Sequence, residues 1–271
     1  MIKRLALCVA ISSSCLLAGA DGIHDPRIQA ALVQIHSGQW TDRAAGFYSM
    51  ARAGLSADRR SEFPVADGVS AISRADAESR LVLVQALNAL LDLESNLVNS
   101  GKAPIGDESY SDYYGDVIQA VTVLRDTTSA PVLLKCINTG GMAVGTLASL
   151  GDEALSAAMN LLVSTADAET RHSLFRMFAE MAEPRNLSRL KAPDSRSKLL
   201  NVLLEGARDG DPYSRLGATP GLARFTTPEA VQTLRRLAES DPFTWPGESA
   251  PRYLVREAAS KALKMAASQN K

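Results

Sequence analysis

An arginine recurs along this chain at intervals of roughly forty residues, each time at the start of an apolar stretch with helical periodicity. A small or apolar residue stands three positions after each arginine, and a methionine, leucine or phenylalanine stands seven positions after it. The arginines are Arg43, Arg80, Arg171, Arg215 and Arg256. Because such positions share one face of an α-helix, each stretch offers a face for burial. A repeat of this length predicts an α-solenoid, in which neighbouring helix pairs cover one another.

One position in the series lacks its arginine. Residues 123–132 (VLRDTTSAPV) match residues 222–231 (LARFTTPEAV) at an offset of 99 residues, which places Asp116 where Arg215 stands. The step from Asp116 to Arg171 is longer than the others and contains the glycine-rich residues 140–150. We therefore expect residues 98–150 to form an irregular centre.

Helix boundaries are marked along most of the chain after Ala20. Asp or Thr followed by proline or an acidic residue is typical of a helix start, and glycines mark several stops. The clearest starts are at Asp25, Asp76, Asp167, Asp211 and Thr227. No stretch alternates in the way that strands do, so an all-α fold is expected.

Two C-terminal segments carry a resemblance to a known family. Asp211-Pro212 followed by Arg215, and residues 253–263 around Arg256, resemble the turn and second helix of HEAT repeats. The resemblance covers most of residues 25–267 and implies a right-handed α-solenoid of about six antiparallel helix pairs. It also implies that the recurring arginines form a structural ladder between neighbouring repeats, although an anion-binding row is an alternative.

The N-terminus has the pattern of a secretory signal peptide. Lys3 and Arg4 precede a short apolar run that ends at Ala18-Gly19-Ala20, which predicts cleavage after Ala20. The run is too short and too polar for a membrane span. Lipoprotein processing at Cys15 is an alternative that the preceding serines make less favourable. We expect residues 1–20 to be a signal peptide and residues 21–271 an exported HEAT-like domain, periplasmic or extracellular.

Removal of the signal peptide would leave Cys136 as the only cysteine, in an apolar helical stretch. It is expected to be a small buried residue, without an activating basic cluster.

Charge and motifs exclude several functional classes. The chain has 29 Lys and Arg against 30 Asp and Glu, so it lacks the basic excess that nucleic-acid binding needs. His24, His36 and His172 are isolated from one another, and no catalytic or phosphate-binding motif is complete. We therefore predict no catalytic activity, no metal site and no cofactor.

Two segments are candidate binding sites. Glu108, Asp112 and Asp116 recur every four residues around Tyr113, and could attract a cation or a basic partner. Phe243 and Trp245 lie in a proline-stiffened insertion, where they could dock a partner or cover the terminal repeat.

These observations predict a binding or scaffold protein for a protein or peptide partner, which would lie on the surface lined by the second helices. One alternative is a structural or inhibitory component of the cell envelope. Another is a small-ligand binder or enzyme that uses residues 107–150.

Overall fold

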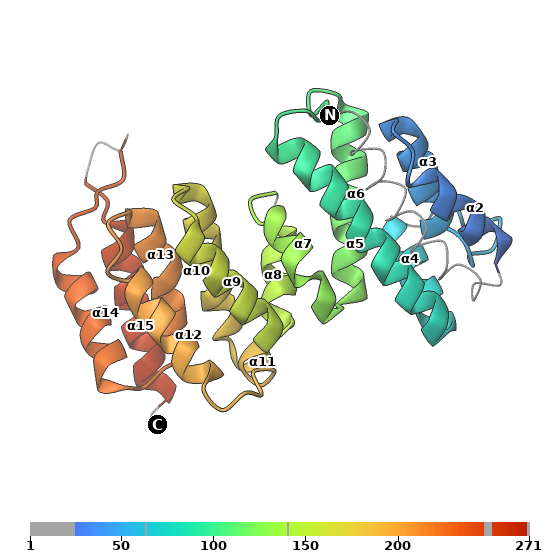
Figure 1. Ribbon diagram of the computed structural model, residues 1–271. Helices are drawn as coiled ribbons and strands as arrows, with labels where there is room; N and C mark the ends of the chain where they lie inside the picture. Colours follow the sequence, from blue (N-terminus) through green and yellow to red (C-terminus); the bar gives the residue numbers. More distant parts are fainter. Residues whose placement is uncertain (1–24, 63, 140, 247–250, 270–271) are drawn as a thin grey trace. The chain divides into compact units, whose positions relative to one another are not determined.

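The computed structural model describes residues 25–62, 64–139, 141–246 and 251–269 (Figure 1). Fourteen α-helices and one 3-10 turn account for most of this part of the chain. A single isolated bridge, between Trp245 and Arg252, is the one β-type pairing in these ranges. The all-α prediction is confirmed. The predicted signal peptide, with Cys8 and Cys15, lies outside the described residues.

The chain divides into two compact units, residues 1–136 and residues 137–271. The helices of unit 1 are α2 (Pro26–Gln34), α3 (Trp40–Ala51), α4 (Val65–Ala75), α5 (Ala77–Asn99), α6 (Glu108–Leu124) and α7 (Ala130–Lys135), with the 3-10 turn at Thr127–Ser129. In this unit α2 pairs with α3 and α5 pairs with α6. Helix α4 is an addition between the pairs and packs against α3, α5 and α6.

Unit 2 repeats the helix pair more regularly. Its helices are α8 (Met142–Ser149), α9 (Asp152–Ser164), α10 (Ala168–Met181), α11 (Pro184–Leu187), α12 (Ser195–Gly206), α13 (Pro212–Leu222), α14 (Pro228–Ser240) and α15 (Leu254–Gln269). The pairs are α9 with α10, α12 with α13, and α14 with α15.

The helices of unit 2 form two layers. The second helices α8, α10, α13 and α15 contact one another in that order, and the first helices α9, α12 and α14 do the same. Stacked helix pairs of this kind are what the arginine repeat predicts. The handedness of a superhelix stays a prediction.

The predicted helix starts have a direct structural cause. A side-chain oxygen just before each of six helices accepts a hydrogen bond from a backbone N–H of the first turn, which would otherwise lack a partner. The capping residues are Asp25, Asp76, Asp107, Asp167, Asp211 and Thr227. Short polar signals therefore fix where the helices begin.

Two arginines of the series make the same set of contacts in different units. Arg43 in α3 donates from Nη1 to the carbonyls of Ser37 and Gly38, at 2.9 and 3.1 Å. Arg215 in α13 donates from Nη1 to the carbonyls six and five residues before it, at 2.9 and 3.0 Å. Each guanidinium ties the turn that precedes its helix to that helix.

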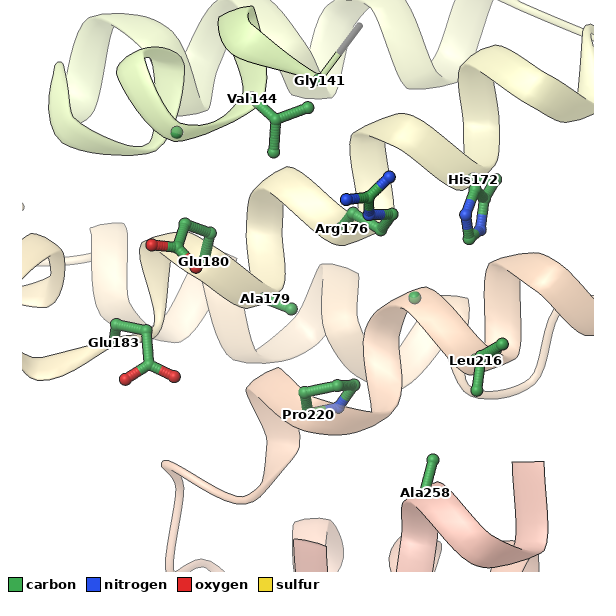
Figure 2. Close-up of a pocket in the computed structure, with 12 residues that line it drawn as sticks. Gly141, Val144, His172, Arg176, Ala179, Glu180, Glu183, Leu216, Pro220 and Ala258 are labelled. Atoms are coloured by element: carbon green, nitrogen blue, oxygen red, sulfur yellow. The ribbon is translucent and has the colours of Figure 1, made fainter. Parts of the chain in front are cut away.

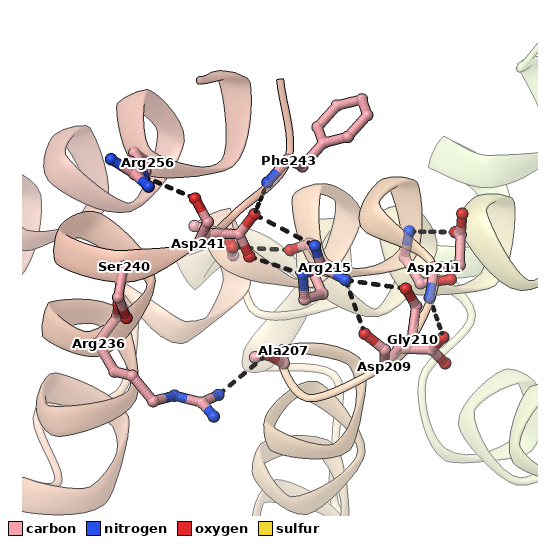
Figure 3. A network of polar contacts seen from close by, with 12 residues as sticks. Ala207, Asp209, Gly210, Asp211, Arg215, Arg236, Ser240, Asp241, Phe243 and Arg256 are labelled. Carbon is pink, nitrogen blue, oxygen red and sulfur yellow. Dashed lines mark hydrogen bonds and ion pairs between the residues drawn. The ribbon is translucent and has the colours of Figure 1, made fainter. Parts of the chain in front are cut away.

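The same guanidinium groups also bind a carboxylate of the following helix pair, Glu94 within α5 and Asp241 directly after α14. Arg43 donates to both oxygens of Glu94, at 2.6 and 3.2 Å. Arg215 donates to both oxygens of Asp241, at 2.7 and 3.2 Å, as the network in Figure 3 shows. Two parallel bonds to a planar guanidinium fix orientation as well as distance. Each arginine thus joins its own helix pair to the following one.

Two more arginines extend this pattern in unit 2. Arg171 in α10 donates to the carbonyl of Leu162 at 3.3 Å and forms an ion pair with Asp209. Arg256 in α15 donates to the carbonyl of Asp241 at 2.6 Å. These contacts support the structural interpretation of the ladder over an exposed anion-binding row.

Arg80 does not belong to the same row. It lies in the first turn of α5, which is a first helix, and donates to the carbonyl of Leu124 at 2.8 Å. Because helix α4 is inserted between α3 and α5, the interval from Arg43 to Arg80 is close to the interval between arginines of two successive second helices.

The carboxylate of Glu94 is the centre of a buried network in unit 1. Glu94 is fully buried and Arg43 is 3% exposed. The hydroxyls of Tyr110 and Tyr113 donate to Glu94 at 2.8 and 2.9 Å. Burial raises the pKa of both tyrosines, and the negative charge of Glu94 raises it further, so that both remain donors. The network leaves neither oxygen of Glu94 unpaired.

Helix α5 has the length and apolar composition of a membrane span, the only such helix within the described ranges. Half of its apolar window is buried inside unit 1. Its side chains serve the core of that unit, where Leu87 and Leu91 are fully buried.

Replacement of Arg43 by methionine should lower the free energy of unfolding by about 3–5 kcal/mol, because Glu94 would be left charged and buried without its partner. Urea denaturation followed by circular dichroism measures the change. The matched control is Arg208→Met, since Arg208 and its partner Glu229 are more than half exposed. The control should cost less than about 1 kcal/mol. Equal losses in the two variants would contradict a stabilising role for the buried network.

Two glycine-to-alanine substitutions should change stability in opposite directions. A Cβ at Gly221 in α13 would lie 2.8 Å from the Cα of Ala179, so Gly221→Ala should destabilise by about 1–3 kcal/mol. A Cβ at Gly115 in α6 would meet nothing within 4 Å, so Gly115→Ala should stabilise by about 0.5–1 kcal/mol. Thermal denaturation distinguishes them, and an unchanged midpoint for Gly221→Ala would refute the close packing of α13 on α10.

A candidate binding groove on the second helices

The surface of the second helices, where the sequence predicts binding, is hollowed in unit 2. A groove with a volume of about 600 Å³ runs over α8, α10, α13 and α15 (Figure 2). Its lining includes Val144 from α8, Ala179 from α10, Pro220 from α13 and Ala258 from α15. All four second helices of the unit therefore contribute to one concave surface.

Small residues make the groove. Gly217 lets α13 approach α10 closely, since a Cβ there would lie 3.2 Å from the carbonyl oxygen of His172. Gly145, Ala179 and Ala258 also line the surface and carry little or no side chain. Because neighbouring helices meet through such residues, the space above them stays open to a ligand.

A row of polar side chains follows one face of α10 along the groove. His172, Arg176 and Glu180 recur every four residues, and Glu183 follows just after the helix. In Figure 2, Glu180 and Glu183 lie toward one end, with Arg176 and His172 toward the other. Residues at this spacing share a helix face.

His172 is held in one orientation by α13. Its Nδ1 lies 2.7 Å from the carbonyl oxygen of Tyr213. A carbonyl oxygen only accepts, so Nδ1 carries the hydrogen and donates it. The second ring nitrogen, Nε2, is then an acceptor in the neutral ring and a donor in the charged one.

The charges of the groove are not balanced. Glu180 forms an ion pair with Arg185, and Glu183 accepts from Nη2 of Arg224 at 2.8 and 2.6 Å. Arg176 is exposed, and its guanidinium makes no hydrogen bond or ion pair with the part of the chain that the structure describes. The unpaired charge of the groove is therefore positive.

An aromatic cluster adjoins the His172 end of the groove. The ring of Tyr213 lies 5.6 Å from that of Phe243, 6.2 Å from that of Trp245 and 6.0 Å from that of His172. The backbone N–H of Phe243 donates to Asp241 at 3.0 Å, and that of Trp245 donates to the carbonyl of Arg252 at 2.8 Å. The loop is thus tied to the arginine network of Figure 3.

Of the two roles considered for Phe243 and Trp245, the packing of their rings fits the covering role, and docking of a partner stays a prediction. Both rings pack on Tyr213 at the start of α13, which covers that end of the helix. Tyr213 and Trp245 nevertheless remain 38% exposed each. Large aromatic side chains held in place but partly exposed are suited to contact a partner. Residues 247–250 of the same loop lie outside the described residues.

The acidic candidates lie in unit 1. Helix α6 begins at Glu108, so Glu108, Asp112 and Asp116 share a face as the spacing predicts. Asp116 accepts a hydrogen bond from the hydroxyl of Tyr48 at 3.0 Å. Burial raises the pKa of Asp116, and the hydrogen bond from Tyr48 opposes this shift. Asp116 thus joins α6 to α3, while Asp112 is exposed.

Tyr113 requires a correction. It is fully buried, and its hydroxyl is engaged by Glu94, so a surface partner has no access to it. Tyr113 directly follows Asp112 in the sequence, which suggests a shared surface. On a helix, however, the side chains of two successive residues point to different faces.

Cys136 is buried, as expected, and burial raises the pKa of its thiol to about 12. Among the described residues, no group of three or more His, Cys, Asp or Glu side chains is placed to hold a metal ion.

The groove residues of α10 and α13 were not predicted as binding residues from the sequence. They stand in register with the arginine series: His172 and Arg176 lie one and five positions after Arg171, and Leu216 and Pro220 lie one and five positions after Arg215. Extending the register to these positions would have found the surface. Their chemistry alone gives no signal, since lone residues of these types are common on exposed helix faces.

Comparisons with known proteins identify no family for the chain. No protein-family model matches it, and no curated protein does. It is similar in structure to an archaeal HEAT-like repeats protein from Thermococcus onnurineus, with a TM-score of 0.42 and 11% identity, over 91% of this chain and 99% of that one. It is also similar to an engineered protein, with a TM-score of 0.38 and 16% identity, over 89% of this chain and 96% of that one. Likenesses of this size add nothing to what the helix packing itself shows.

Proposed function

We propose that this protein is an exported scaffold that binds a short extended segment of a protein partner in the groove of unit 2. The groove over α8, α10, α13 and α15 is the observation that carries this proposal. Helical repeats create such concave surfaces from the regular rotation between neighbouring units, and these surfaces serve as binding sites.

The dimensions of the groove suit a peptide. His172 and Glu183 are eleven residues apart along α10 and its end, which corresponds to about 16 Å at the rise of an α-helix. An extended chain advances roughly 3.3 Å per residue, so about five residues match the length of this polar row. A segment of this size is an ordinary recognition element for a groove with pockets for its side chains.

The lining has the mixed character of a binding surface. Val144, Ala179 and Pro220 supply apolar contact, while His172, Arg176 and Glu180 lie along the same helix row. Apolar surface of this kind contributes affinity, and a few fixed polar groups orient the ligand. Exposed rings of Tyr213 and Trp245 at one end extend the surface that a partner could contact.

We propose a binding role without catalytic chemistry. Both carboxylates of the groove, Glu180 and Glu183, are engaged in ion pairs with arginines. A general base needs a carboxylate or imidazole within reach of a substrate proton, and engaged carboxylates are poor candidates for that role. His172 offers Nε2, but among the described residues the groove lining includes no serine, threonine or cysteine that this nitrogen could activate.

The proposal of export rests on residues 1–20, with their basic start, apolar run and Ala18-Gly19-Ala20. Export to the periplasm or the medium would give partners of the cell envelope access to the groove. The absence of paired cysteines after Ala20 fits a domain that relies on its apolar core.

Cleavage of the N-terminus can be tested by expressing the full chain in a bacterium and sequencing the N-terminus of the exported form. It should begin at Asp21, and replacing Ala20 by phenylalanine should block processing, because the cleavage site accepts small residues. The control is Cys15→Ser, which should leave processing unchanged. If Cys15→Ser blocks processing instead, the chain is a lipoprotein and free export is wrong.

Occlusion of the groove tests the binding site. A Cβ at Gly145 would meet nothing within 4 Å, and Gly145 lines the groove, so Gly145→Leu should fill it without disturbing the fold. Peptides are first selected on the wild-type protein from a random display library. Their affinity for Gly145→Leu, measured by fluorescence polarisation, should fall about tenfold or more, since an apolar contact surface is lost.

The matched control for this experiment is Gly115→Leu. Gly115 is also a helical glycine with open space around its Cβ position, but it lies in α6 of unit 1. Peptide affinity should be unchanged in this variant. Undiminished binding by Gly145→Leu, or a loss confined to Gly115→Leu, would refute the groove as the binding site.

A further inference from the structure

The groove has a free cation at an interior position. We propose that it selects protein segments with an aspartate or glutamate side chain near their centre, flanked by small apolar residues, and that Arg176 binds this carboxylate. The inference rests on the proposed function, because it specifies the ligand of the same groove.

Charge complementarity supports an acidic ligand. The two carboxylates of the groove already have arginine partners, Arg185 for Glu180 and Arg224 for Glu183. Arg176 has no such partner among the described residues. A segment with a carboxylate would pair this remaining charge, whereas a basic segment would have to compete with Arg185 and Arg224 for the carboxylates.

The position of Arg176 indicates a side-chain carboxylate and not a chain terminus. Arg176 lies four residues after His172 and seven residues before Glu183, which places it about 6 Å from one end of the row and about 10 Å from the other. A bound segment would therefore extend past Arg176 in both directions. An acidic residue within the segment meets this geometry.

The surroundings of Arg176 explain the expected apolar neighbours. Figure 2 shows its guanidinium on the side of α10 that faces Val144 of α8, with Leu216 and Pro220 of α13 on the other side. A segment seated here would cover the guanidinium and exclude water from it, which strengthens a bond to a carboxylate. The guanidinium also has a planar fork of donors that matches both carboxylate oxygens.

The test uses two display libraries of peptides of about seven residues. One has Asp or Glu at the central position and the other has Asn or Gln, with all other positions random and the C-terminus amidated. The wild-type protein should bind peptides selected from the acidic library about tenfold more tightly than their Asn or Gln counterparts. Arg176→Gln should abolish this preference, and Arg176→Glu should shift selection toward peptides with a central Lys or Arg.

The charge-matched control is Arg196→Gln. Arg196 is exposed at the start of α12 and does not line the groove. This variant should keep the preference for acidic peptides, as the wild type does. Because the guanidinium of Arg176 is exposed and has no partner among the described residues, its replacement should leave the fold intact, which circular dichroism checks.

Each other outcome has a defined meaning. One outcome is that Gly145→Leu loses binding while the wild-type protein shows no preference for acidic peptides. In that case Arg176 does not select the ligand, and the groove still stands as the proposed binding site. A preference that persists in Arg176→Gln also overturns the inference. So does binding that requires a free C-terminal carboxylate. If Gly145→Leu binds as the wild type does, the proposed function and this inference both fail.

Discussion

The fold depends on one recurring interaction, the arginine in the first turn of a second helix that bonds in two directions. Arg43 and Arg215 each hold two carbonyls of the preceding turn and a carboxylate of the following helix pair. The first set of bonds joins the turn between the two helices of a pair to the second helix, and the second set joins that pair to the next. Since a guanidinium is always charged and rigid, Arg43 and Arg215 reproduce the same geometry in the two units.

The groove is a consequence of that register. When each second helix begins at the same point relative to its neighbours, residues one and five positions after the arginine fall on one surface, as His172, Arg176, Leu216 and Pro220 do. Glycines at the contacts bring α10 and α13 close together and leave the surface above them shallow. A structural repeat thus produces a concave surface without any motif for binding.

The period, the caps and the arginine series were sufficient to predict the all-α repeat, because these signals are local. The partner of Arg43 was not predictable, since the inserted α4 places Glu94 fifty-one residues away, while Asp241 is only twenty-six residues from Arg215. The same insertion made Arg80 look like a member of the series. Tyr113 was misjudged because it stands beside the acidic residues in sequence, while the helix turns its side chain toward the buried carboxylate of Glu94.

Hydrogen exchange tests most directly that unit 2 binds through its second helices. Backbone amide exchange of the protein would be compared with and without a peptide selected on it, at saturating concentration. The account predicts slower exchange in α8, α10, α13 and α15, with α9, α12 and α14 unchanged, since the peptide would lie on the second-helix layer only. Slowing confined to the first helices, or to α6 of unit 1, would contradict it.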